Sequence, residues 1–303
     1  MLKHSIVLTV YNAPDDVRLC LRSIINSLDF SCAELIIVDD ASREETQKIL
    51  DDFAAENPAV ILVRHEKNQG YLSSVNHGIS HTHGDIITLL NSDTYIPCDF
   101  SSRIQACFAH NEKIGVASPV LSHGNPFSVP VTYTPEQKIR EDCLLSRLDY
   151  MDKKAKNIVP LYPNTVFCDG ACFSFSRQCL EQAGEFNEEY SPGYFEEIDF
   201  CMRAQQKGFS CVLIENLYIY HKAHASFGKK KCEYMKRNET RFYREWANEY
   251  NRLIKRFPKK EHKKRVFCSF YPFWYYVLVE SLLKVSRIIP CSYIRRKIRS
   301  LYQ

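Results

Sequence analysis

Three carboxylates fall close together in the segment GYFEEIDFCMR, at Glu196, Glu197 and Asp199. They follow a Ser-Pro-Gly loop and open a predicted helix. One of them can act as a general base if it lies within hydrogen-bonding distance of a hydroxyl that must lose its proton. Alternatively, the acids form an ordinary first turn, because negative side chains stabilise the N-terminus of a helix.

A second group of polar side chains follows three predicted strands, at the point where each strand ends. The stretches are TVYN (9–12), DDAS (39–42) and NSDT (91–94). Ligands of open parallel sheets bind outside the carboxyl ends of the strands, so these residues are expected to meet in one crevice. Acids, amides and an aromatic ring suit a polar, metal-bound ligand. Asp93 is placed to hold Mg²⁺ or Mn²⁺, which prefer carboxylate oxygen, unless it only caps the turn after its strand.

Several other kinds of site are excluded or disfavoured. The chain has no glycine fingerprint for a dinucleotide and no GxxxxGK[ST] loop, so a phosphate-bearing ligand would need a divalent cation. The 13 cysteines have no repeating spacing, and no zinc-ribbon pattern occurs. This pattern indicates a reducing compartment, with most cysteines serving as small core residues.

The elements that position these residues alternate along the first part of the chain. Apolar runs predict buried strands at 5–10, 34–40, 59–63 and 85–91. Helices are predicted between them, the second one with a capping box formed by Ser42 and Glu45. Alternation of this kind is typical of a mostly parallel sheet with helices on both faces, which is an α/β fold.

The later part of the chain is less regular. Strands are predicted at 114–121 and 211–221, with a pair of strands around Gly170 within 166–177. Residues 122–165 contain several prolines and predict loops and short helices.

The C-terminal segment differs in charge from the rest. Residues 251–303 carry 14 Lys/Arg and 2 acids, while the remainder carries 26 basic and 34 acidic residues. The acidic remainder argues against nucleic-acid binding over the whole surface. Within 266–290 only about 14 residues precede Glu280, short of the roughly 20 apolar residues that span a bilayer. The aromatic, basic segment predicts a helix on an anionic membrane surface, or one packed on the body or on another subunit.

Five motifs in series carry a resemblance to a known family: SIVLTVYN, ELIIVDDAS, NQGYLSSVNHGI, GDIITLLNSDTYI and FEEIDFCMR. Together they resemble the family 2 glycosyltransferases, which are inverting enzymes with the GT-A (nucleotide-diphospho-sugar transferase) fold. The sub-type is similar to bacterial, rhamnosyltransferase-like enzymes of surface polysaccharides. The resemblance covers roughly residues 4–225 and implies a GT-A domain at 1–225, followed by a basic, aromatic-rich helical extension at 226–303.

The resemblance implies a donor site. Its first-strand residues cradle the nucleotide base, with Tyr11 suited to stack on a pyrimidine and Asp40, with Asp39 beside it, to accept from the imide N–H. In full, the donor-binding residues that it implies are Thr9, Tyr11, Asn12, Asp39, Asp40, Asn68, Gly70, Asn76, Asn91 and Ser92. Asn91-Ser92-Asp93 matches the DXD-like element. Because Asn91 replaces the first acid, Asp93 is the principal metal-linked carboxylate.

The same resemblance implies the remaining roles. His221 joins the metal, with His224 as competitor; alternatively, His221 only caps the last strand. Asp169, Gly170 and Glu196 line the acceptor side. The second acid of the family's acidic pair is the usual base, which here is Glu197, one methylene longer than the usual Asp. Asp199 stands four residues before Arg203, a spacing that also favours a surface ion pair.

The implied reaction moves a hexosyl or deoxyhexosyl group from a UDP-, dTDP- or GDP-sugar to a hydroxyl of a growing, lipid-linked glycan. The implied location is the cytoplasmic face of the inner membrane, as a peripheral protein. A sugar nucleotidyltransferase is the enzymatic alternative, but TVYNAPDD lacks that class's glycine-rich loop with Arg or Lys. A catalytically degenerate donor-binding scaffold is the other alternative, since Glu stands at the base position and Asn91 in the metal motif.

Overall fold

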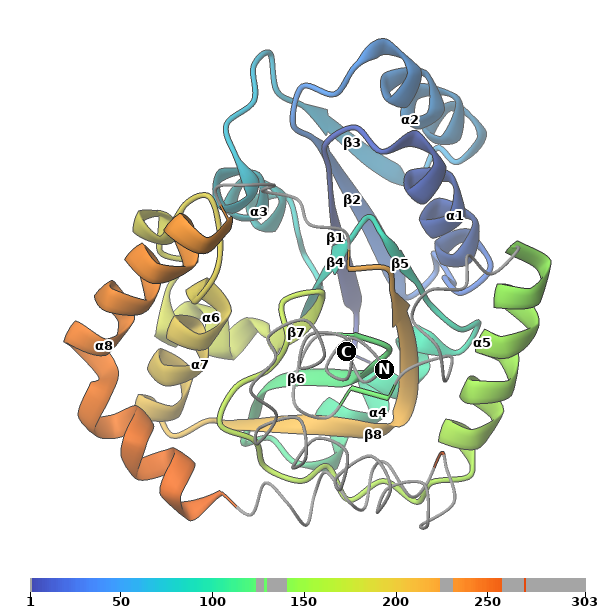
Figure 1. Cartoon of the computed structure of the whole chain (residues 1–303). Coiled ribbons are helices and arrows are strands. Elements are labelled where there is room, and N and C mark those ends of the chain that lie inside the picture. The colour runs from blue at the N-terminus through green and yellow to red at the C-terminus, as the bar shows by residue number, and fades with distance from the viewer. Residues whose placement is uncertain (1, 124–127, 130–140, 224–230, 258–269, 271–303) are drawn as a thin grey trace, which may run out of the picture.

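The protein is described by a computed structural model that covers residues 2–123, 128–129, 141–223, 231–257 and 270. Its centre is an eight-stranded mixed sheet with the order β3-β2-β1-β4-β7-β6-β8-β5 (Figure 1). The strands are β1 (His4–Val10), β2 (Ala33–Asp39), β3 (Val60–Arg64), β4 (Ile86–Asn91), β5 (Thr94–Tyr95), β6 (Ile114–Leu121), β7 (Cys172–Ser176) and β8 (Ser210–His221).

The first half of the sheet is parallel, as its sequence predicts. β1 pairs in parallel with β2 and β4, and β2 with β3. β7 then enters antiparallel between β4 and β6, while β6 and β8 are parallel. The register of β8 against β6 shifts after Pro119, and the far end of β8 pairs antiparallel with the short β5. Figure 1 shows the resulting bend of β8 toward β5.

Helices cover both faces of the sheet because its strands are apolar on both sides. The helices are α1 (Pro14–Ile25), α2 (Glu44–Glu56), α3 (Tyr71–Ser80), α4 (Phe100–His110), α5 (Glu141–Lys156), α6 (Arg177–Ala183), α7 (Glu196–Gln206), α8 (Lys231–Arg256) and the short 3-10 helix η1 (Glu188–Tyr190). Alternate residues of β1 show the division: Ile6 and Leu8 pack with α1, α2 and α4, whereas Val7 packs with α3, α6 and α7. A third apolar cluster joins α5 to β6 and β8.

α8 belongs to the second of these layers. Its Phe242 and Trp246 are buried in the same apolar cluster as Phe200 of α7. Helix α8, which is part of the predicted C-terminal extension, therefore packs directly on the helix that carries the candidate base. The apolar segment 266–290 lies outside the described residues except for Phe270, so its association with a membrane stays a prediction. None of the described helices is both long and apolar enough to span a bilayer.

Two local predictions are wrong. The Ser42–Glu45 capping box does not form: α2 begins at Glu44, and Ser42 Oγ accepts a hydrogen bond from the Asn12 amide instead, at 2.8 Å. Ser42 thus ties the loop after β2 to the loop after β1. The predicted strand pair around Gly170 is a single strand, β7, because the residues before it leave the sheet to form the loop that carries Asp169.

Candidate active site

The three polar strand ends lie side by side, as expected. Thr9 of β1 pairs with Asn91 of β4, and Val10 pairs with Asp39 of β2. Immediately beyond them, Tyr11 is 56% exposed, so its ring is available to a ligand. Asn12 adopts a left-handed φ of 59°, which Asn tolerates better than most residues. Its Oδ1 accepts from the Arg43 amide at 2.9 Å, so the loops after β1 and β2 hold each other.

Asp39 and Asp40 are both buried, and both brace the loops of this crevice. Asp39 accepts from Arg64 Nε at 2.7 Å and from the Ser42 amide at 2.9 Å. Asp40 accepts from His65 Nδ1 at 2.8 Å. It also accepts from the backbone amides of Gln69 and Gly70, at 2.7 and 2.9 Å. Asp40 therefore fixes the turn that opens α3, a role that its position after a strand does not reveal.

The predicted donor residues of the α3 segment have different hydrogen-bond partners. Gly70, with φ of 91°, opens the helix. The side-chain Nδ2 of Asn68 donates to the Asp40 backbone carbonyl at 3.3 Å. Asn76 instead uses both ends of its side chain elsewhere. It donates to the Phe186 carbonyl at 2.9 Å and accepts from the Phe186 amide at 3.1 Å. Asn76 thus ties α3 to the segment before η1.

Asp93 and His221 are brought together by the pairing of β5 with β8. Thr94 pairs with His221, and the Lys222 amide donates to the Asp93 carbonyl at 3.1 Å. His221 Nε2 lies 3.4 Å from Asp93 Oδ1, while its Nδ1 lies 3.2 Å from the His123 carbonyl. Burial lowers the pKa of His221, but the hydrogen bond and charge of Asp93 outweigh burial and raise it. His224 lies outside the described residues.

This pair fits part of a Mg²⁺ or Mn²⁺ site. A hydrogen bond from Nδ1 to the His123 carbonyl sets the neutral tautomer in which Nε2 could bind a cation beside the Asp93 carboxylate, in place of its contact with Asp93. Among the described residues, no group of three His, Cys, Asp or Glu side chains could enclose an ion. Mg²⁺ commonly keeps water and substrate phosphate oxygens in its other positions, so a two-residue protein site is compatible with this chemistry.

The acidic helix start lies against the predicted acceptor loop. A Cβ atom added to Gly170 would sit 3.9 Å from Cγ and Cδ of Glu197, so the glycine lies against that side chain in ordinary contact. Asp169 Oδ1 accepts from the Ala171 amide at 2.9 Å. Glu196 is 8% exposed, and Oε2 of Glu196 and Oε2 of Glu197 are both buried without a hydrogen-bond partner in the described part of the chain.

Burial raises the pKa of all three acids, and for Glu196 and Glu197 the charge of a neighbouring acid adds to the rise. Burial raises the pKa of Glu196 to about 7, and the charge of Asp169 contributes to the rise. The pKa of Glu197 is raised well above its usual value, first by burial and then by the charge of Glu196. Burial also raises the pKa of Asp169. A carboxylate in such a site is a stronger proton acceptor than an exposed one once it has lost its own proton.

Asp199 is an ion-pair partner, as predicted, but not at the surface. Its Oδ2 accepts from Arg203 Nε at 2.9 Å, and it is only 1% exposed. The second oxygen accepts from Trp246 Nε1 of α8 at 2.9 Å. The expectation of a surface pair is wrong because α8 covers this side of α7.

Sequence reasoning missed two further residues. Tyr71 lies near the acids: burial raises the pKa of its phenol, as do the charges of Glu196 and Glu197. Its place next to Gly70 in a motif was an available signal. Asn238 of α8 is fully buried, and its amide donates to the carbonyls of Tyr190, Gly193 and Tyr194 at 2.6, 2.7 and 3.1 Å. No local pattern marks an asparagine within a long polar helix.

The chain is similar to proteins that transfer sugars. It is 32% identical over 111 residues to undecaprenyl-phosphate 4-deoxy-4-formamido-L-arabinose transferase of Klebsiella pneumoniae, covering 34% of this chain and 33% of that protein. It is 31% identical over 122 residues to poly-beta-1,6-N-acetyl-D-glucosamine synthase of Staphylococcus epidermidis, covering 40% and 28%. The chain thus matches a third or less of the length of these curated relatives.

Solved structures share the fold. The mannosyltransferase PcManGT from Pyrobaculum calidifontis, in complex with GDP-Man and Mn²⁺, matches with a TM-score of 0.61 at 13% identity, over 99% of this chain and 85% of that one. S. aureus TarS in complex with UDP-GlcNAc matches with a TM-score of 0.55 at 14% identity, over 89% and 71%. A family model for glycosyl transferase family 2 matches residues 5–184, more than half of the 303 residues. The mixed α/β sheet is accordingly a GT-A fold, and the chain belongs to glycosyl transferase family 2.

Proposed function

We propose that this chain is an inverting glycosyltransferase that moves a sugar from a nucleotide-diphospho-sugar to a hydroxyl of a glycan. One observation carries the proposal: a metal-capable pair and a proton-accepting acid come from different segments but share one neighbour. Asp169 directly precedes Gly170, which lies against the Glu197 side chain, and its charge raises the pKa of both Glu197 and His221. An inverting transfer needs this division between a leaving-group side and a base side.

The roles follow from the environment of each group. A divalent cation, when bound at Asp93 and His221, would neutralise charge on the departing diphosphate. Tyr11 offers an exposed ring beside the strand ends, where a nucleotide base can stack. Glu197 Oε2 is buried and lacks a partner among the described residues, so an acceptor hydroxyl can supply the missing hydrogen bond. Proton transfer to this oxygen would then accompany attack on the sugar.

The finer specificity also belongs to the proposal. UDP-, dTDP- and GDP-sugars are the candidate donors, with a hexosyl or deoxyhexosyl group transferred. The transferase from Klebsiella pneumoniae is named for an undecaprenyl-phosphate substrate, which supports a lipid-linked acceptor here. The corresponding proposed location is the cytoplasmic membrane surface, reached through the basic tail.

A panel of nucleotide sugars with Mn²⁺ tests this function. The cognate donor is expected to raise the melting temperature by mass action and to release nucleoside diphosphate slowly without acceptor. Asp93→Ala should abolish the Mn²⁺-dependent part of both effects. The matched control is Asp52→Ala, which removes an exposed acid of α2 that lies outside the site. A donor that stabilises the chain but is never hydrolysed or transferred would instead favour the degenerate, donor-binding scaffold.

A further inference from the structure

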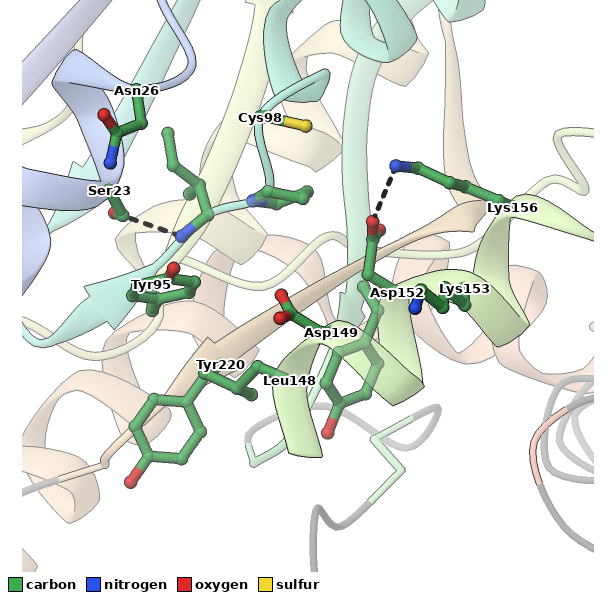
Figure 2. A pocket seen from close by; sticks show the side chains of 13 residues that line it. Ser23, Asn26, Tyr95, Cys98, Leu148, Asp149, Asp152, Lys153, Lys156 and Tyr220 are labelled. Carbon is green, nitrogen blue, oxygen red and sulfur yellow. Dashed lines mark hydrogen bonds and ion pairs between the residues drawn. The ribbon is translucent and has the colours of Figure 1, made fainter. Parts of the chain in front are cut away.

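A cavity of about 300 Å³ lies beside the candidate active site and plays no part in the roles assigned above. It is open to solvent on one side and is lined by the end of α1, the loop after β5, one side of α5 and the outer part of β8 (Figure 2). Ligand pockets commonly begin at roughly this volume, which leaves room for a ligand the size of one sugar ring.

The cavity lies against the same two strands that bring the metal-capable pair together. Tyr95 and Tyr220 are paired residues of β5 and β8 and both line the cavity. The adjacent residues along the same two strands are Thr94 and His221, and Asp93 directly precedes Thr94 in the chain. A ligand in the cavity would therefore contact the two strands whose ends hold Asp93 and His221.

The lining offers polar groups without partners. In the part of the chain that the structure describes, no hydrogen bond or ion pair is formed by the side chains of Asn26, Tyr95, Asp149, Lys153 or Tyr220. Figure 2 shows Asp149 reaching from α5 toward Tyr95. Two tyrosine rings, an amide, a carboxylate and an ammonium group can together bind several hydroxyls and one apolar ring face.

The charges of the lining balance, and its outer wall is braced. Asp149 and Asp152 stand against Lys153 and Lys156, so the cavity does not select an anion. Lys156 pairs with Asp152 at 3.0 Å, and Asp152 also accepts from the buried Arg103 at 2.6 Å. The wall of α5 is thus held in place, while Asp149 and Lys153 remain available. This chemistry fits a neutral ligand that is rich in hydroxyl groups.

We infer that the cavity binds one neutral pyranose unit of the glycan acceptor, away from the hydroxyl that reacts. The sugar binding follows from the cavity itself, and its assignment to an acceptor rests on the proposed function. A sugar held there would anchor the growing chain across the β5–β8 pair and select acceptors by a residue remote from the new linkage.

Cys98 gives a direct readout, since its exposed thiol lines the cavity. The full chain is alkylated with iodoacetamide in the presence of the methyl glycosides of glucose, galactose, mannose, rhamnose and N-acetylglucosamine, and peptide mass spectrometry follows each cysteine. At least one glycoside should slow modification of Cys98 severalfold and leave Cys232, an exposed cysteine of α8, unchanged. Asp149→Asn should remove this protection, whereas Tyr150→Ala, an exposed neighbour outside the cavity, should not.

Three results would overturn the inference. Cys98 could react at the same rate with every glycoside, both cysteines could be protected equally, or protection could arise only from an intact nucleotide sugar. The last result would assign the cavity to the donor. Because alkylation needs no turnover, the experiment remains readable if the chain hydrolyses no nucleotide sugar and the proposed function fails.

Discussion

Removing the side chain of Asn238 should destabilise the loop that leads to the candidate base. An amide nitrogen has two hydrogens, so its contacts with the carbonyls of Tyr190, Gly193 and Tyr194 amount to two hydrogen bonds with one hydrogen shared. Each bond contributes about 0.5–1.5 kcal/mol, and a buried carbonyl left without a donor costs about 1–3 kcal/mol. Asn238→Ala should therefore lower the free energy of unfolding by about 2–4 kcal/mol.

The loop should also move, because it is held in an unfavourable conformation. Tyr194 and Phe195 have φ of 74° and 75°, in the left-handed region that costs non-glycine residues about 1–3 kcal/mol each. Without the three contacts this strain can relax, and Glu196 and Glu197 follow directly. A misplacement of about 1 Å near reacting groups costs roughly 100-fold in rate. The donor crevice is built by β1, β2 and β4 and should keep its affinity.

The assay combines thermal melting, donor titration and nucleoside diphosphate release with the cognate donor. Asn238→Ala should melt roughly 4–8 °C lower and lose kcat by about 10- to 100-fold, with donor Kd changed less than about twofold. Asn248→Ala, an exposed position of the same helix, is the matched control. An unchanged kcat, or a fall in kcat matched by an equal loss of donor affinity, would refute the positioning role.

Three further predictions concern the same helix start. Glu197→Gln should abolish transfer and leave donor binding measured by calorimetry intact; near-normal turnover would move the base to Glu196 or Asp199. The folded chain retains the Glu196 proton up to a pKa of about 7, while the unfolded chain releases it near 4.5, so the free energy of unfolding should fall as pH rises through that interval. Urea titrations should show this fall diminished in Glu196→Gln. Trp246→Phe removes a bond to a buried carboxylate and should cost about 1.5–3 kcal/mol in urea, with equal stability arguing against that contact.

The strand ends could be predicted from the sequence because their signals are local. Apolar, β-branched runs define β1, β2 and β4, and the carboxyl ends of parallel strands meet at one edge. The neighbouring positions of Thr9, Asp39 and Asn91 therefore follow from the sequence alone. The pairing of Asp93 with His221 came from the family resemblance, since nothing in the spacing of residues so far apart predicts their contact.

The contacts that could not be predicted depend on tertiary packing. Ser42 stands in a capping-box pattern, yet its hydroxyl accepts a hydrogen bond from the backbone of the loop after β1. The sequence around Asp199 predicts a surface acid, whereas in the structure α8 covers it. Asn76 and Asp40 have motif positions that suggest ligand binding, while their side chains hold neighbouring loops. In each case the side chain binds a partner from a distant segment of the chain, and the local sequence pattern does not reveal that partner.

α8 has a consequence for how activity can vary within this architecture. The family match ends at residue 184, yet the helix whose Asn238 is hydrogen-bonded to the loop before Glu197 begins at Lys231. A chain shortened to residue 225 would keep every strand of the crevice and lose both Asn238 and Trp246. Such a chain should still bind a nucleotide sugar but position the candidate general base, Glu197, less precisely. Donor binding and turnover would then depend on different segments of the chain. If the proposed function holds, changes confined to α8 should adjust the rate of transfer without altering the donor.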